Sequence, residues 1–128
     1  MRLFWIAFGG AVGTCARYLL SGWAVDRFGP AFPFGTLAVN AIGSFLLAGL
    51  MYIGVEAGML PPTLRLALTT GVMGGFTTYS TFSYETMRYL QDGAWRLAIL
   101  NVMITVGACL AACILGWAAA QWLVSPSA

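Results

Sequence analysis

Long apolar runs divide the chain into four segments that are separated by short polar turns. The runs cover about residues 3–23, 35–55, 63–90 and 95–124, and the turns between them carry most of the charged residues and prolines. An α-helix needs about 20 apolar residues to cross a hydrocarbon core roughly 30 Å thick. We therefore expect an all-α integral membrane protein, with residues 1–128 forming one domain of four transmembrane helices and both termini on one side.

The first run has a second interpretation, because Arg2 gives it the basic start of a signal peptide. A signal peptide delivers a polar mature domain, whereas here the first run is followed by further apolar runs. We interpret it as a helix that is retained in the membrane.

The composition agrees with a chain embedded in lipid. Of the 128 residues, 60% are hydrophobic and 8% are charged, whereas a soluble domain has about 25% charged residues. Histidine and lysine are absent, which removes the usual general base, zinc ligand and Schiff-base amine, so we do not expect an enzyme. The arginines form no basic patch, so we expect no nucleic-acid partner. The three cysteines are predicted to be small buried hydrophobic residues.

The middle of the third run differs from the other runs in its glycine and hydroxyl content. It reads GVMGGFTTYSTFSYE from Gly71 to Glu85. Glycine and threonine have low helix propensity, and side-chain hydroxyls compete for backbone partners, so we predict a helix break between Gly74 and Thr78. Carbonyls freed at this depth must be buried in protein or line a watery cavity, and they suit a small cation. The alternative is a continuous helix that uses its glycines for packing.

Polar or small residues recur every four positions in the first two runs. Gly9, Gly13 and Arg17 share one helix face, and Asn40 and Ser44 share another. An arginine inside a span faces protein or water, where it pairs with a carboxylate or caps freed carbonyls; the alternative is snorkelling to the interface. Asn40 either forms an interhelical hydrogen bond or faces a ligand.

The fourth run carries Asn101, Thr105 and Cys109 at the same spacing, which predicts a continuous polar track along one helix. Tyr79 and Phe82 lie three residues apart, so their ring edges can face a small anion, or the two rings can simply pack. The polar groups on these faces are neutral apart from Arg17. This argues against a multiply charged substrate.

Three segments together resemble the bacterial CrcB/Fluc fluoride-channel family: GGAVGTCARY at residues 9–18, FGTLAVNAIGSF at 34–45, and GVMGGFTTYSTFSYE at 71–85. The resemblance covers the whole chain. It implies a dual-topology antiparallel homodimer in the cell inner membrane, surrounded by lipid, that passes fluoride passively through two narrow pores along the subunit interface. Such a channel lowers fluoride toxicity.

The resemblance also implies roles for individual residues. A structural sodium ion would be held at the two-fold axis by the backbone carbonyls of Gly74 and Thr77 from both subunits. Arg17 and Glu85 are polar structural positions. The chain departs from the family in having tyrosine at position 79 for phenylalanine and cysteine at position 109 for a hydroxyl residue. The implied fluoride pathway comprises Asn40, Tyr79, Phe82, Ser80, Thr81, Ser83, Asn101, Thr105 and Cys109.

The arginines at the ends of the predicted helices are nearly balanced between the two sides. Arg2 and Arg65 fall on one side, whereas Arg27, Arg88 and Arg96 fall on the other. Orientation in the membrane follows the arginine and lysine bias of short loops. A bias of three to two gives little preference, as a dual-topology chain requires.

Two other functions fit a small four-helix membrane protein. One is a proton-coupled multidrug exporter, which needs a carboxylate buried in the first helix, where this chain has Arg17. The other is a non-transporting membrane assembly subunit whose glycines serve only close packing. Ion flux in liposomes that contain only the purified protein separates all three.

Overall fold

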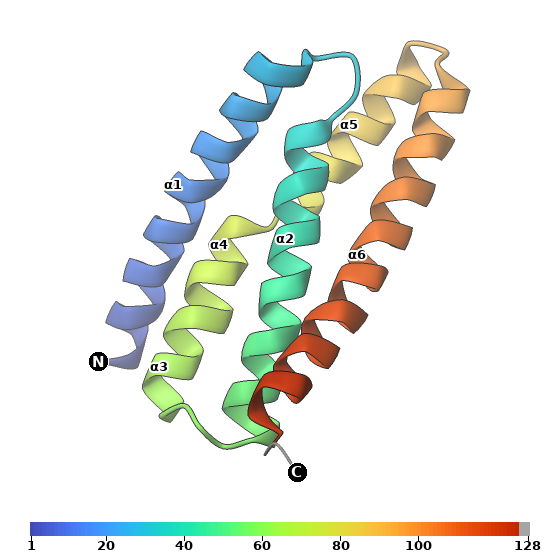
Figure 1. Ribbon diagram of the computed structural model, residues 1–128. Helices are drawn as coiled ribbons and strands as arrows, with labels where there is room; N and C mark the ends of the chain where they lie inside the picture. Colours follow the sequence, from blue (N-terminus) through green and yellow to red (C-terminus); the bar gives the residue numbers. More distant parts are fainter. Residues whose placement is uncertain (126–128) are drawn as a thin grey trace.

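The computed structural model describes residues 1–125, and all regular secondary structure in them is helical. The long helices are α1 (Arg2–Phe28), α2 (Phe34–Met51), which the π-helical turn η1 (Tyr52–Glu56) extends, and α6 (Trp95–Val124). Figure 1 shows α1 beginning and α6 ending at the same end of the bundle. The prediction of an all-helical protein is confirmed.

Three segments are long and apolar enough to cross a membrane, namely Arg2–Phe28, Phe34–Glu56 and Trp95–Val124. Large apolar side chains such as Met103 and Ile114 point away from the bundle, whereas Asn101 and Thr105 are buried. This is the reverse of a soluble protein, in which polar residues are mostly exposed. The outer surface therefore suits contact with lipid tails.

The third predicted span, residues 63–90, consists of several short elements. These are α3 (Pro62–Leu66), the π-helical η2 (Ala67–Met73), α4 (Gly74–Phe76) and α5 (Tyr79–Gln91). Between α4 and α5 the backbone is extended at Thr77 (φ −86°, ψ 157°) and Thr78 (φ −151°, ψ 114°). That these pieces together cross a membrane stays a prediction.

The extended residues let the chain change neighbours. The elements before them pack mainly against α1, whereas α5 packs mainly against α6. Figure 1 shows the first half lying between α1 and α2, and α5 lying between α2 and α6. Because α2 contacts both halves, the extended residues lie against the middle of α2.

The contact between α1 and η2 is close enough to exclude side chains. A Cβ atom added to Gly9 would lie 2.5 Å from the carbonyl oxygen of Ala67, and one added to Gly13 would overlap the carbonyl of Val72. Only glycine lets two helix backbones approach this closely. The glycines at spacing four in α1 therefore bring η2 into backbone contact with it.

Candidate functional site

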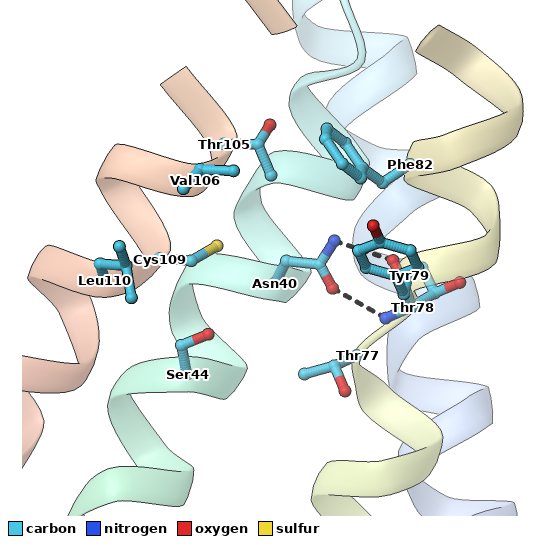
Figure 2. A pocket seen from close by; sticks show the side chains of 10 residues that line it. All are labelled: Asn40, Ser44, Thr77, Thr78, Tyr79, Phe82, Thr105, Val106, Cys109 and Leu110. Atoms are coloured by element: carbon cyan, nitrogen blue, oxygen red, sulfur yellow. Dashed lines mark hydrogen bonds between the residues drawn. The ribbon is translucent and has the colours of Figure 1, made fainter. Parts of the chain in front are cut away.

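Side chains from α1 and α2 hold the chain at the extended residues and just before them. The Nδ2 of Asn40 donates to the carbonyl oxygen of Thr78 (2.9 Å), and the N–H of Thr78 donates to Oδ1 of Asn40 (2.7 Å) (Figure 2). The Nε of Arg17 donates to the carbonyl oxygen of Gly75 (3.0 Å). Of the roles left open for Arg17, the geometry shows that it caps a carbonyl. The side chain of Asn40 replaces the backbone partners that Thr78 would have in a continuous helix.

Two further carbonyls lose their helical donors. In a continuous helix the N–H of Thr78 would donate to the oxygen of Gly74, and the N–H of Thr81 to that of Thr77. Instead, the first donates to Asn40, and the second donates to Oγ1 of Thr78 (3.3 Å), which caps the start of α5. The oxygens of Gly74 and Thr77 are therefore available to another partner.

A cleft of about 330 Å³ lies between α2, α6, the extended residues and the first turn of α5 (Figure 2). Amide, hydroxyl, thiol and aromatic side chains line it, together with an apolar part from α6, and none of them carries a formal charge. Such a lining can replace the water around a small ion with neutral dipoles. The residues are Asn40, Ser44, Thr77, Thr78, Tyr79, Phe82, Thr105, Val106, Cys109 and Leu110.

The two aromatic residues of the cleft meet at an angle. The ring centroids of Tyr79 and Phe82 lie 5.8 Å apart, with 60° between the ring planes. Phe82 is buried, whereas Tyr79 is 80% exposed. The cleft therefore has an aromatic wall with one ring fixed in the bundle and the other on its surface.

This chain matches the family described as CrcB-like protein, Camphor Resistance (CrcB), over residues 4–117. The chain belongs to the CrcB-like family. It is 53% identical over 124 residues to the fluoride-specific ion channel FluC of Sorangium cellulosum, covering 97% of this chain and 98% of the relative. The protein of the same name from Anaeromyxobacter dehalogenans is 50% identical over 122 residues, which is 95% of this chain and 97% of the relative. The resemblance drawn from the three motifs is thereby confirmed.

The structure of this CrcB-like chain brings some of the predicted site residues together and leaves others apart. Those that line the cleft are Asn40, Thr77, Tyr79, Phe82, Thr105 and Cys109. Ser80, Ser83 and Gly74 are exposed outside that lining, and Thr81 lies in the capping turn of α5. Sequence reasoning missed Thr78 and Ser44 as lining residues. Ser44 had a signal, because it lies one helical turn after Asn40.

Asn101 is not among the residues that line the cleft, and it is 1% exposed. Its Nδ2 donates to Oγ1 of Thr86 (3.0 Å), and its Oδ1 accepts from the hydroxyl of Thr105 (3.3 Å). Asn101 therefore joins α6 to α5, and the hydroxyl proton of Thr105 is directed at Asn101.

Glu85 and Tyr89 connect the C-terminal part of α5 to the rest of the bundle by hydrogen bonds. The Oγ1 of Thr36 in α2 donates to the carboxylate of Glu85. One turn further along α5, the hydroxyl of Tyr89 donates to the carbonyl oxygen of Ala31 (2.9 Å), in the segment between α1 and α2. These contacts give Glu85 a structural partner in α2.

The prediction that the cysteines are buried is wrong. Cys15 is exposed on α1, and Cys109 and Cys113 are each partly exposed on α6. Apolar surroundings in the sequence do not imply burial here, because apolar residues also cover the outside of the bundle. The two thiols of α6 are therefore accessible from the cleft side or from the surface of the helix.

Proposed function

We propose that this CrcB-like chain is a fluoride-specific ion channel that passes fluoride passively. The observation that supports this best is the cleft with a neutral polar lining beside the extended residues Thr77 and Thr78. Relatives that match nearly the full chain carry the name fluoride-specific ion channel, which is a transport function and not an enzymatic one.

The cleft offers several protons to a small anion. The amide of Asn40 keeps its second Nδ2 hydrogen after donating to Thr78. The hydroxyls of Ser44 and Tyr79 and the thiol of Cys109 also lie on the cleft wall, and each can rotate its proton toward an anion. Neutral donors hold fluoride without the strong attraction of a charge, and conduction requires that an ion can leave again.

The test is efflux from liposomes that contain only the purified protein and are loaded with potassium fluoride or potassium chloride. We expect rapid fluoride efflux without a proton gradient and little chloride efflux, because a narrow path replaces the hydration shell of one ion size. Equal chloride efflux would contradict a fluoride-specific channel. Efflux that needs a proton gradient would favour a coupled exporter, and no efflux would favour an assembly subunit.

We further propose that the carbonyl oxygens of Gly74 and Thr77 hold a structural sodium ion. Sodium prefers hard oxygen ligands, and both oxygens have lost their helical donors to Asn40 and Thr78. Within residues 1–125 there is no group of three or more His, Cys, Asp or Glu side chains that would supply another metal site. The ion would neutralise carbonyl dipoles that are otherwise costly in a membrane.

A sodium titration of fluoride efflux tests this site. Gly74→Ala is the suitable variant, because an added Cβ meets no atom within 4 Å and favours a continuous helix by about 1 kcal/mol. We expect it to need more sodium than wild type for half-maximal efflux. Gly75→Ala does not serve, because its Cβ would lie 2.5 Å from the carbonyl oxygen of Gly10. Full wild-type efflux in sodium-free buffer, or a fixed ratio of sodium to fluoride transported, would contradict a structural sodium.

We also propose that the chain works as a dual-topology antiparallel homodimer in the cell inner membrane. The cleft is open, and Tyr79 on its wall is 80% exposed in a single subunit, so a second copy would complete the path. The start of α1 and α3 lie at one end of the bundle, opposite the ends of α1 and α5 (Figure 1). The arginines outside the middle of α1 are thus shared three to two between the two ends.

Changing the arginine bias tests this assembly. Four arginines added beside Arg2 should fix one orientation, because they change the balance from two to three into six to three, and short-loop charges set topology. Such a chain should not protect a fluoride-sensitive host by itself, whereas co-expression with a copy biased the other way should restore protection. A biased chain that works alone would contradict antiparallel assembly.

A further inference from the structure

Two cysteines on α6 lie against one residue of α2. Cys109 lines the cleft together with Ser44, and the Sγ of Cys113 lies 3.5 Å from the carbonyl oxygen of Ser44. Both cysteines are partly exposed and neither forms a disulfide. Figure 2 shows the sulfur of Cys109 pointing from α6 toward α2. The two thiols therefore occupy the same side of α6, one turn apart.

This spacing suits an ion that takes two sulfur ligands. Side chains at positions i and i+4 of a helix have Cβ atoms about 5–6 Å apart. Two metal–sulfur bonds of roughly 2.3 Å each, as zinc thiolates have, span a comparable distance. Thiolate sulfur selects soft cations, of which copper(I) is the biological example, over sodium or magnesium.

We propose that Cys109 and Cys113 form a binding site for a soft monovalent cation, copper(I) or silver(I), and that its occupation stops ion passage through the cleft. The binding itself is independent of the transported ion, whereas the block rests on the proposed fluoride channel. Each thiol loses its proton to water as its S–H bond breaks, and two metal–sulfur bonds form without any change of oxidation state. The bound unit carries one negative charge, which repels an anion in the cleft.

Silver(I) is the probe, supplied as silver nitrate in chloride-free buffer. Silver binding to the purified full-length chain is measured by titration calorimetry and native mass spectrometry. We expect the double variant Cys109→Ser/Cys113→Ser to bind silver about a hundredfold more weakly, because two ligands on one helix reinforce each other through effective concentration. Cys15→Ser is the matched control, since Cys15 is an exposed thiol on α1. It should keep the tight site.

Fluoride efflux from liposomes gives the second measurement, with each variant compared with its own untreated rate. Silver should lower the efflux of wild type and Cys15→Ser about tenfold, and an excess of free thiol should restore it. Cys113→Ser should be blocked much less, and it is the sharper variant because Cys113 does not line the cleft.

The outcomes separate the two proposals. Tight silver binding that needs Cys109 and Cys113, in a chain that passes no fluoride, would support the site and overturn the channel. Fluoride efflux that silver blocks equally in wild type and in the double variant would overturn the site and leave the channel standing. Loss of tight binding in Cys15→Ser would also overturn the site.

Discussion

The segment from α3 to α5 has two halves, which meet at Thr77 and Thr78 and are held in place by different means. Before Thr77, the chain lies in backbone contact with α1, at glycines where a Cβ atom has no room. After Thr78, side-chain hydrogen bonds position α5, from Thr36 to Glu85 and from Asn101 to Thr86. The first half is therefore held mainly by close backbone packing, with one hydrogen bond from Arg17 to the carbonyl oxygen of Gly75, whereas the position of the second half depends on several individual polar groups.

The cleft is bordered mainly by the second half and by α2 and α6. The glycine contact with α1 then fixes the position of the first half, and we call this contact the frame. The hydrogen-bonded second half supplies the surface along which an ion would move. Apart from changes at the proposed sodium ligand Gly74, substitutions in the first half should mainly change folding, and substitutions in the second half or at its junction with α2 should mainly change transport.

Gly13→Ala should have the largest effect of the substitutions considered. The added Cβ would overlap the carbonyl of Val72, so α1 and η2 would have to separate. Overpacking costs about 1–3 kcal/mol, and more where backbone must move. We expect little folded protein and a clearly lower melting temperature in detergent.

Gly22→Ala is the matched control on the same helix, because its Cβ would meet no atom within 4 Å. It should leave the protein folded and raise its stability by up to about 1 kcal/mol, the difference in helix propensity between alanine and glycine. Equal melting temperatures for the two variants would contradict the frame.

Asn40→Asp should abolish most transport in a protein that still folds. The carboxylate can still accept from the N–H of Thr78 but no longer donates to the carbonyl of Thr78. It also faces the cleft, where two like charges about 4 Å apart repel by about 4 kcal/mol at an effective dielectric constant of 20. One third of that energy lowers a rate about tenfold.

The measurement for Asn40→Asp is fluoride efflux, with size-exclusion chromatography as the check on folding. Wild-type efflux from a correctly folded variant would show that Asn40 braces the extended residues without facing the ion. Loss of the folded species would place Asn40 with the frame instead of the conducting surface.

Arg17→Met should lower stability by an intermediate amount. Methionine fills much of the same space but leaves the carbonyl of Gly75 without the donor that Arg17 supplies. A buried group that loses its partner costs about 1–3 kcal/mol, and since the carbonyl of Gly75 is only partly buried we expect a loss near the lower end. Arg27→Met, in the last turn of the same helix, is the control and should change stability by less than about 0.5 kcal/mol. Thermal unfolding in detergent should separate the two variants, and equal shifts would contradict a bracing role for Arg17.

The sequence was sufficient for the all-helical fold, because long apolar runs and spacing-four stripes are local properties. It was also sufficient to bring Asn40 and Ser44 to one helix face and Thr105 and Cys109 to another, and the structure places all four on the cleft. A stripe does not say which helix lies opposite, so Asn101 was assigned to the same path as Thr105. The structure places Thr105 on the cleft, whereas the amide of Asn101 donates to Thr86 of α5, and a role for Asn101 in the fluoride path stays a prediction.

The hydrogen-bond partner of Asn40 also could not be predicted from the sequence. Its amide bonds to the backbone of Thr78, which any residue type would present, so no side chain in the sequence indicates the pair. The prediction that the cysteines are buried was wrong for a related reason. Apolar neighbours in the sequence occur on the lipid-facing side of a helix as well as in the core of the bundle.

Thr77→Val should have the smallest effect, although Thr77 supplies one of the proposed sodium ligands. Its hydroxyl donates back to the carbonyl oxygen of Met73 at the end of η2 (3.0 Å), and its γ-methyl fills the space over Gly43. Valine keeps this shape and leaves the backbone carbonyl unchanged. Side-chain hydrogen bonds in membranes average about 0.6 kcal/mol, so efflux and its sodium dependence should stay within about threefold of wild type. If Thr77→Val instead removed the sodium dependence, the hydroxyl and not the carbonyl would hold the ion.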